Sequence, residues 1–184
     1  MSMSKARIEI IIGCMFSGKS TELIRRVSRY ESIGMSVLVI NHELDTRTDY
    51  AIQTHSNHRY KAKKIAHLMN SELISSEEFS NVQVIGVDEA QFFPDLREFA
   101  LYCELKGKTL IIAGLSGDFK RRPFGHIFEC IPLCDDIVLL SALDMVSRDG
   151  SQAIFSKRIS DNREQTDIGA SDKYVAVNRT NYLA

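Results

Sequence analysis

The sequence lacks both an excess of positive charge and a long apolar run. Lys and Arg together number 23 against 24 Asp and Glu, which gives a formal net charge of −1. Proteins that bind nucleic acid through bulk charge usually have a large basic excess, so we expect no nucleic-acid partner. No apolar run approaches the roughly 20 residues that a membrane-spanning helix needs. We therefore also expect no association with a membrane.

Two further absences indicate a cytoplasmic protein. The first residues lack the separate charged, apolar and small-residue regions of a signal peptide. The four cysteines, Cys14, Cys103, Cys130 and Cys134, show no paired framework, and the cytosol keeps thiols reduced. We expect four free thiols and a cytoplasmic location.

The length and composition are typical of one globular unit. A chain of 184 residues fits one domain, or one domain with a small appendage, because a domain typically takes about 100 to 200 residues. Hydrophobic residues make up 44% of the chain and charged residues 26%. This balance provides enough apolar material for a core and is unlike that of a disordered chain.

Short apolar runs alternate with segments of helical spacing through most of the chain. The apolar runs predict buried strands at residues 7–12, 36–40, 81–87, 108–113 and 137–140. The periodic segments predict helices at residues 19–33, 61–73, 94–105 and from 123 to 128. Residues 41–60 are polar and without a sustained period, which predicts a long loop.

The alternation of strands and helices predicts an α/β fold with a parallel sheet, helices on both faces and right-handed crossovers. Residues after Ser141 are polar and poorly periodic, which predicts a small attached lobe. We therefore divide the chain into an α/β domain of residues 1–141 and a lobe of residues 142–184. Ligands of such sheets bind beyond the carboxyl ends of the strands.

A phosphate-binding loop, GCMFSGKS, follows the first predicted strand. It matches G-x-x-x-x-G-K-[ST] and lies between a predicted strand and a predicted helix, as that motif requires. Backbone amides of such a loop point at phosphate oxygens, while Lys19 reaches the β and γ phosphates and Ser20 reaches Mg²⁺. The motif thus predicts a P-loop NTPase-type sheet that uses ATP and Mg²⁺. The residues predicted to bind phosphate are Gly13, Cys14, Met15, Phe16, Ser17, Gly18, Lys19 and Ser20.

Two carboxylates follow the third predicted strand. Asp88 is placed to hold Mg²⁺ together with Ser20, as an acid at this strand end does in P-loop NTPases. Neighbours at a strand end point in different directions, so Glu89 can face a substrate hydroxyl while Asp88 faces the metal. Glu89 is therefore a candidate general base; the alternative is an outer residue of the metal site.

Five blocks, GCMFSGKSTEL, DEAQFFPD, GLSGDFKRRPFG, FSKR and GASDKY, follow one another along the chain. In their order and spacing they resemble the type II thymidine kinase family, and the similarity extends from about residue 8 to residue 182. The resemblance implies transfer of the γ-phosphoryl group of ATP to the 5′-hydroxyl of thymidine, with Glu89 as the base. It also places Asp45 and Arg47 near the phosphates, where a guanidinium can match developing charge. The alternative for this pair is a solvated ion pair.

The same resemblance implies that a lasso-like loop of the lobe, residues 160–171, encloses the nucleoside. The pocket residues that it implies are Met15, Phe92, Leu115, Phe119, Phe124, Ser156, Arg158, Gln165, Gly169 and Tyr174. The main chain of Gln165 and Gly169 would hold the pyrimidine edge. A small apolar pocket discriminates by only about 1 to 3 kcal/mol per methylene, so we expect deoxyuridine to be a substrate as well.

The sequence departs from the family at its structural zinc site. The positions that correspond to the family's two C-x-x-C pairs are Asp144, Ser147, Asn178 and Asn181. Serine and asparagine are poor Zn²⁺ ligands, so we expect no structural zinc. Hydrogen bonds among these side chains, packing by nearby tyrosines or subunit contacts would take its place.

Two other groups of metal-ligand residue types are poor candidates for a site. His126, Cys130 and Cys134 have helical spacing, but Pro132 interrupts the repeat and the segment is strongly apolar. Histidines in polar loops are usually solvated, and we expect this of the histidines of the predicted loop, at positions 42, 55 and 58. We expect no metal at either group.

The resemblance further implies a homotetramer and feedback inhibition by dTTP. Two other functions fit the phosphate-binding loop. A regulatory protein could bind ATP or dTTP without catalysis, if the lobe without zinc no longer closes. A DNA-dependent ATPase motor shares the sheet plan but needs a basic DNA path, which a chain of net charge −1 does not provide.

Overall fold

A six-stranded parallel sheet forms the centre of the protein. The computed structural model describes residues 6–45, 51–53, 59–162, 164–165 and 173–184. The strand order is β5-β2-β6-β7-β1-β8, and every neighbouring pair is parallel. The strands are β1 (Arg7–Gly13), β2 (Val37–His42), β5 (Lys63–Ile65), β6 (Val84–Val87), β7 (Thr109–Leu115) and β8 (Asp136–Leu140).

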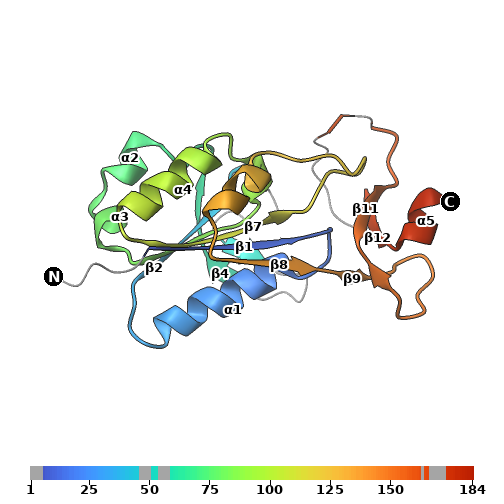
Figure 1. Cartoon of the computed structure of the whole chain (residues 1–184), viewed down its shortest axis with the longest axis horizontal. Coiled ribbons are helices and arrows are strands. Elements are labelled where there is room, and N and C mark those ends of the chain that lie inside the picture. Colours follow the sequence, from blue (N-terminus) through green and yellow to red (C-terminus); the bar gives the residue numbers. More distant parts are fainter. Residues whose placement is uncertain (1–5, 46–50, 54–58, 163, 166–172) are drawn as a thin grey trace.

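Helices cover both faces of this sheet (Figure 1). One face is covered by α1 (Lys19–Glu31). The other is covered by α2 (Ser71–Ile74), α3 (Glu77–Asn81), α4 (Leu96–Leu105) and the 3₁₀ helix η2 (Ile127–Leu133). Leu23 of α1 packs with Ile11, whereas Phe99 of α4 packs with Ile10, because successive residues of a strand point to opposite faces. The predicted α/β fold is confirmed.

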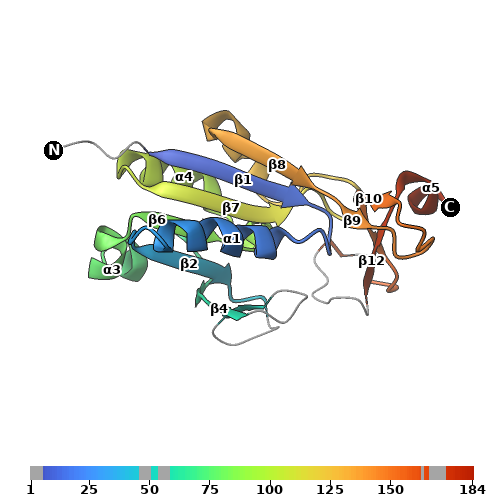
Figure 2. The same ribbon diagram turned by 90° about the horizontal axis from the view of Figure 1, so that it is seen from below.

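The last part of the chain lies beyond the carboxyl ends of β1 and β8, as Figures 1 and 2 show. Two antiparallel pairs, β9 with β10 and β11 with β12, and one terminal helix form it. Their bounds are β9 (Ala142–Leu143), β10 (Gln152–Ala153), β11 (Phe155–Arg158), β12 (Tyr174–Val177) and α5 (Arg179–Leu183). This C-terminal part therefore stands at the edge of the sheet where the ligands of parallel sheets bind.

The helix predicted over residues 61–73 is wrong. Lys63–Ile65 forms β5, an edge strand that pairs with Ile40–His42 of β2. Only Ser71–Ile74 is helical, and it begins where the side chain of Asn70 accepts a hydrogen bond from the amide of Glu72. The lysines and alanine before this point favour a helix locally, but pairing with β2 overrides that preference.

Two other predicted segments also need correction. The predicted loop of residues 41–60 contains the end of β2 and most of an antiparallel ribbon formed by β3 (Ala51–Gln53) and β4 (Arg59–Lys61). The helix predicted from Pro123 begins instead at Ile127 and is a 3₁₀ helix. Gly125 has φ +63°, a left-handed conformation that a continuous right-handed helix does not contain.

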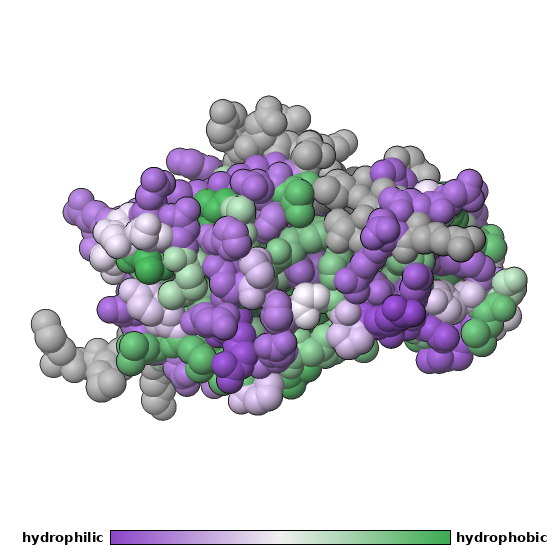
Figure 3. Space-filling view, turned by 90° about the horizontal axis from the view of Figure 1, so that it is seen from above, coloured by the Kyte–Doolittle hydropathy of each residue, from purple (hydrophilic) through white to green (hydrophobic). Residues whose placement is uncertain are grey.

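Within the described residues, no helix combines the length and the apolar composition that crossing a bilayer requires. The longest, α1, has 13 residues. The face of the molecule above α2 and α4 is largely hydrophilic, with hydrophobic residues in small groups between the polar ones (Figure 3).

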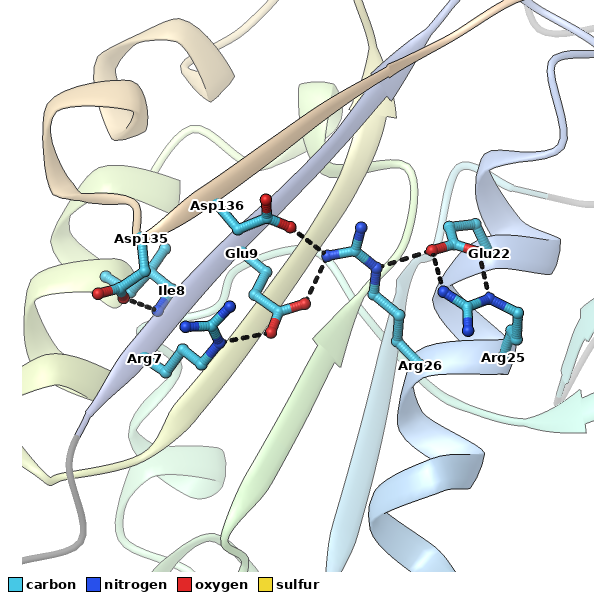
Figure 4. Close-up of polar contacts among 8 residues, drawn as sticks. All are labelled: Arg7, Ile8, Glu9, Glu22, Arg25, Arg26, Asp135 and Asp136. Atoms are coloured by element: carbon cyan, nitrogen blue, oxygen red, sulfur yellow. Dashed lines mark hydrogen bonds and ion pairs between the residues drawn. The ribbon is translucent and has the colours of Figure 1, made fainter.

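A network of charged residues attaches α1 to β1 and β8 (Figure 4). Arg26 of α1 donates hydrogen bonds to Glu9 at 2.5 Å, to Glu22 at 2.8 Å and to Asp136 at 2.9 Å. Glu22 also accepts two hydrogen bonds from Arg25. Because Glu9 and Arg26 are largely buried, removing one of these charges would leave the other unpaired inside the protein.

The ionisation of Glu22 makes part of the stability dependent on pH. Hydrogen bonds from Arg25, opposed by partial burial and aided by Arg26, lower the pKa of Glu22 from 4.5 to about 2. A carboxyl whose pKa is lower in the folded state stabilises that state above its unfolded pKa. The contribution then falls as the pH drops from about 4.5 towards about 2.

We expect Glu22→Gln to lower the free energy of unfolding by about 1 kcal/mol at pH 7, the range of a partly exposed ion pair. The measurement is urea denaturation at pH 7 and pH 3, and the difference from wild type should shrink at pH 3. Glu104→Gln, at an exposed position on α4, is the matched control. An equal difference at both pH values would contradict the assignment.

Candidate functional site

The phosphate-binding loop connects β1 to α1 through two glycines, one at a position without room for a side chain and one with a backbone conformation that favours glycine. A Cβ at Gly13 would lie 2.5 Å from Oγ of Ser17 and 2.6 Å from the carbonyl oxygen of Leu140. Gly18 precedes α1 with φ +85°, in the left-handed region that favours glycine. Oγ of Ser17 donates to the carbonyl of Cys14 at 2.8 Å. The loop is thus folded tightly at the N-terminus of α1.

Ser20 and Asp88, predicted to share a metal ion, are in direct contact. Oγ of Ser20 donates to Oδ2 of Asp88 at 2.7 Å, and Asp88 is only 1% exposed. A hydroxyl and a carboxylate oxygen are ligands that suit Mg²⁺, which usually takes few protein ligands and completes its shell with phosphates and water. Nζ of Lys19 donates to the carbonyl of Cys14 at 2.8 Å, so the ammonium lies against the loop.

Glu89 follows Asp88 at the end of β6 and is more exposed than Asp88. Its backbone has φ +50°, an unfavourable conformation for a residue with a side chain. The short 3₁₀ helix η1 (Ala90–Phe92) begins immediately after it, and Nε2 of Gln91 donates to Oε2 of Glu89 at 2.7 Å. The two acids therefore differ in exposure and in partners, as two residues with different roles would.

Asp45 is buried beside the end of β2. Its carboxylate accepts a hydrogen bond from Nδ2 of Asn41 at 2.8 Å, and Lys64 donates to its carbonyl oxygen. A solvated ion pair, the alternative for Asp45, does not fit a buried side chain. Arg47 lies outside the described residues.

Three of the predicted pocket residues lie near the ends of β6 and β7. Phe92 and Phe124 meet edge to face, with ring centroids 5.6 Å apart. The backbone amide of Leu115, the last residue of β7, donates to the side chain of Gln91 at 3.1 Å. His42 also packs on Phe92, with centroids 5.6 Å apart, and burial lowers the pKa of His42. Sequence reasoning had placed His42 in a solvated loop.

The phosphate-binding loop also contacts the C-terminal part of the chain. The backbone amide of Met15 donates to Oγ of Ser156 at 2.9 Å, and Sγ of Cys14 donates to the carbonyl of Ala153 at 3.4 Å. Burial raises the pKa of Cys14, which disfavours the thiolate form. Ser156, implied by resemblance as a pocket residue, thus uses its side chain to join β11 to the loop.

Arg158 of β11 lies over the ring of Phe119, which belongs to the loop after β7. The guanidinium carbon lies 3.8 Å from the centroid of the Phe119 ring. Arg158 also donates to the hydroxyl of Tyr174 and to the carbonyls of Asn162 and Gln165, the latter two at 2.9 and 3.1 Å. Its donors are thus directed at the protein's own chain.

The side chain of Gln165 also contacts the loop after β7. Its Nε2 donates to Oδ2 of Asp118 at 3.0 Å and to the carbonyl of Pro123 at 3.3 Å. The start of the lasso is therefore attached to the loop after β7. Gly169 lies outside the described residues.

The four positions at which we expect no zinc form a hydrogen-bonded group, which we call the Asp144 cluster: Asp144, Ser147, Asn178 and Asn181. Asp144 is only 3% exposed. Its carboxylate accepts hydrogen bonds from the amides of Ser147 at 2.7 Å and Asn178 at 2.5 Å, and from Nδ2 of Asn181 at 2.9 Å. Nδ2 of Asn181 also donates to Oγ of Ser147 at 2.7 Å.

The Asp144 cluster holds the turn after β9 against the start of α5. Burial raises the pKa of Asp144, but the hydrogen bonds from Asn178, Ser147, Val146 and Asn181 outweigh it and the net pKa lies below its ordinary value. The carboxylate is thus ionised at neutral pH and matched by N–H donors. These residues do not fit a tetrahedral zinc site, because Asp144 is the only strong zinc ligand among them.

The described residues contain no group of three or more His, Cys, Asp or Glu side chains that could hold a metal ion. His55 and His58 lie outside those residues. Sγ of Cys130 donates to the carbonyl of His126 at 3.6 Å, and burial raises the pKa of Cys130 to about 12. Cys130 is thus a buried thiol of the 3₁₀ helix η2.

A family model described as Thymidine kinase matches residues 6–182. The thymidine kinase of Myxoma virus (strain Uriarra) is 43% identical over 183 residues, covering 100% of this chain and 99% of the viral protein. The cytosolic thymidine kinase of Homo sapiens is 40% identical over 182 residues, covering 99% of this chain and 75% of the human protein. The thymidine kinase of Vaccinia virus (strain Western Reserve) is 39% identical over 181 residues, 98% of this chain and 99% of its own.

Because the Asp144 carboxylate has several hydrogen-bond donors, we expect the folded protein to be stable without zinc. We expect Asp144→Ala to lower the melting temperature by roughly 5 °C or more, because it leaves several buried N–H groups without an acceptor. Asp161→Ala, at an exposed position of the same part of the chain, should leave it unchanged. Dialysis against EDTA should not shift the wild-type melting temperature. About one zinc per chain by elemental analysis, together with an EDTA-induced loss of stability, would contradict the assignment.

Proposed function

Because the chain belongs to the thymidine kinase family, we propose that it transfers the γ-phosphoryl group of ATP to the 5′-hydroxyl of thymidine, a step of nucleotide salvage. The resemblance found in the sequence blocks is confirmed at the level of the family. The observation that best supports the proposed chemistry is the direct contact between Ser20 and Asp88 beside Glu89, because it combines a phosphate-binding loop, a metal-ligand pair and a second acid at one strand end.

ATP would bind at the loop of residues 13–20, with Asp45 nearby. The support is the tight turn at the N-terminus of α1, where backbone amides and the helix dipole favour phosphate. Ser20 and Asp88 would hold Mg²⁺, and Lys19 would contact the β and γ phosphates. When bound, Mg²⁺ neutralises charge on the phosphate oxygens.

Glu89 would accept the proton of the 5′-hydroxyl as the oxygen attacks the phosphorus atom. Its position next to the metal pair and its partial exposure support this role. Arg47 and Lys19 would stabilise charge on the transferred group. Most of the rate enhancement in such reactions comes from positioning and charge stabilisation, so the geometry around Glu89 matters as much as its basicity.

The nucleoside would bind between the α/β domain of residues 1–141 and the lobe of residues 142–184. Aromatic packing of Phe92 with Phe124 supports an apolar pocket at this boundary. The contacts of Ser156 and Arg158 support roles in positioning the lobe rather than in lining the pocket. The remaining pocket residues that we propose are Met15, Leu115, Phe119, Gln165, Gly169 and Tyr174.

Selectivity and regulation follow from the same site. An apolar pocket that fits the methyl group of thymidine discriminates only weakly against a nucleoside without this group. Deoxyuridine would therefore also be phosphorylated. dTTP carries both the nucleoside and the triphosphate of the two substrates, which makes it the expected feedback inhibitor. We place the enzyme in the cytoplasm.

We also propose a homotetramer, in which a second copy covers the free edge at β8. Within the described part of the chain, β8 pairs with β1 alone. Ile137 and Leu139 of this strand are 42% and 67% exposed, and Phe128 and Ile131 of the preceding η2 are also exposed. An apolar edge strand is a surface that proteins usually cover.

The proposed reaction is tested by incubating the protein with γ-labelled ATP, Mg²⁺ and either thymidine, deoxyuridine, deoxycytidine or single-stranded DNA. We expect label in thymidine and deoxyuridine monophosphates and no DNA-stimulated ATP hydrolysis. Lys19→Ala should abolish transfer without changing the melting temperature, because it removes one charge that contacts phosphate. Lys106→Ala, at an exposed position after α4, is the control.

Other outcomes would contradict the proposal in distinguishable ways. Calorimetric binding of ATP without transfer to any nucleoside would favour a regulatory nucleotide-binding protein. Stimulation of ATP hydrolysis by DNA would favour a motor. Full activity of Lys19→Ala would remove the assigned role of the loop.

The proposed oligomer is tested by light scattering after size-exclusion chromatography. We expect wild type to elute as a tetramer and Leu139→Lys to elute as a smaller species, because a charge at the β8 edge disfavours burial. Leu105→Lys is the matched control, since Leu105 at the end of α4 is 80% exposed. A monomeric wild type, or a tetramer unaffected by Leu139→Lys, would contradict the assignment.

A further inference from the structure

Gln91 is a buried polar residue. Hydrogen bonds to two partners hold its side-chain amide in one orientation. It lies in η1 and is 3% exposed. Its Oε1 accepts a hydrogen bond from the backbone amide of Leu115 at 3.1 Å, and its Nε2 donates to Oε2 of Glu89 at 2.7 Å. The Leu115 amide can only donate, so the oxygen must face it. The NH₂ group therefore faces the Glu89 carboxylate.

Two glycines make room for Gln91. A Cβ at Gly114 of β7 would lie 2.8 Å from Oε1 of Gln91 and 2.3 Å from Cδ1 of Ile127. A Cβ at Gly125 would lie 2.1 Å from the carbonyl oxygen of Gln91. Any larger residue at either position would push against Gln91 or its surroundings. Strand β7 and the loop after it thus fix both the side chain and the backbone of Gln91.

Glu89 needs such support more than an ordinary glutamate does. Its backbone is in the left-handed region with φ +50°, and its side chain is partly exposed, where several rotamers would be open to it. A hydrogen bond from a rigid donor selects among these rotamers. The donor is neutral, so it orients the carboxylate without adding a charge beside the phosphate site.

We propose that Gln91 is a positioning residue that aims the carboxylate of Glu89 at the substrate hydroxyl. This inference rests on the proposed function, in which Glu89 is the general base. Gln91 would contact Glu89 and would not contact the reacting atoms. It transmits the rigidity of β7 to Glu89 through two hydrogen bonds, one from Leu115 and one to Glu89.

The test is a double-mutant cycle on kcat with Glu89→Gln, Gln91→Met and the double variant. Methionine has a similar length to glutamine but cannot make either hydrogen bond. We expect Gln91→Met to lower kcat by roughly 10- to 100-fold while the KM values for thymidine and ATP change less than about threefold, because a misaimed base affects the transition state. Glu89→Gln alone should lower kcat by about 10² to 10⁴.

The double variant separates positioning from general structural support. If Gln91 acts through Glu89, then Gln91→Met should cost nothing further once Glu89 is replaced, and the double variant should match Glu89→Gln. If the losses of kcat caused by the two substitutions instead multiply in the double variant, the proposal is overturned. Wild-type kcat in Glu89→Gln would overturn both Glu89 as the base and Gln91 as its positioning residue, whereas a large loss in Glu89→Gln with none in Gln91→Met would overturn only the latter.

A second variant covers the case in which Gln91→Met does not fold. Gln91→Glu keeps an oxygen to accept from Leu115 but replaces the NH₂ donor by a carboxylate oxygen. Because Glu89 repels a carboxylate at this buried position, we expect a melting temperature below that of wild type and a kcat at neutral pH lowered at least as far as in Gln91→Met. Gln152→Met, at an exposed position of β10, is the control for the substitution. Wild-type kcat in Gln91→Glu would overturn the proposal.

Discussion

The loop after β1 and the first turn of α1 contact two other parts of the molecule, and the rest of the candidate site depends on these contacts. Ser20 meets Asp88 at the end of β6, and Met15 meets Ser156 of β11. The same loop begins at Gly13, whose neighbours leave no room for a side chain. A shift of the loop would therefore disturb both the Ser20–Asp88 contact and the attachment of β11, so these two contacts would connect the proposed phosphate and nucleoside sites.

A hydrogen-bonded carboxylate can take over the role of a structural metal when the surrounding chain supplies enough donors. In the Asp144 cluster, backbone amides of the turn after β9 and of Asn178, which follows β12, converge on one carboxylate. A single ionised acceptor with several N–H donors holds segments distant in sequence in a fixed arrangement. Unlike a tetrahedral metal site, it does so without thiolates.

The sequence predicts the sheet and the phosphate loop well because the signals for both are local. The hydrophobic patterns of β1 and α1 flank a short motif, and its two glycines are explained by local geometry, Gly13 by lack of room and Gly18 by its positive φ. β5 is missed because three residues rich in lysine become a strand only by pairing with β2. Gln91 is missed for a related reason, since its partner Leu115 lies 24 positions away and a glutamine has no distinctive pattern in sequence.

Resemblance to a family identifies positions but leaves open what each side chain contacts. Phe119 and Arg158 were both assigned to the pocket, yet the guanidinium covers one face of the ring, so at most the other face or the edge of Phe119 can meet a nucleoside. Ser156 accepts a hydrogen bond from the phosphate loop, which a threonine could do equally well. In the proposed complex, nucleoside specificity would therefore depend on the contacts that fix β11 against the loop as well as on the individual pocket residues, because a base held by the proposed lasso can only be as well placed as the lasso itself.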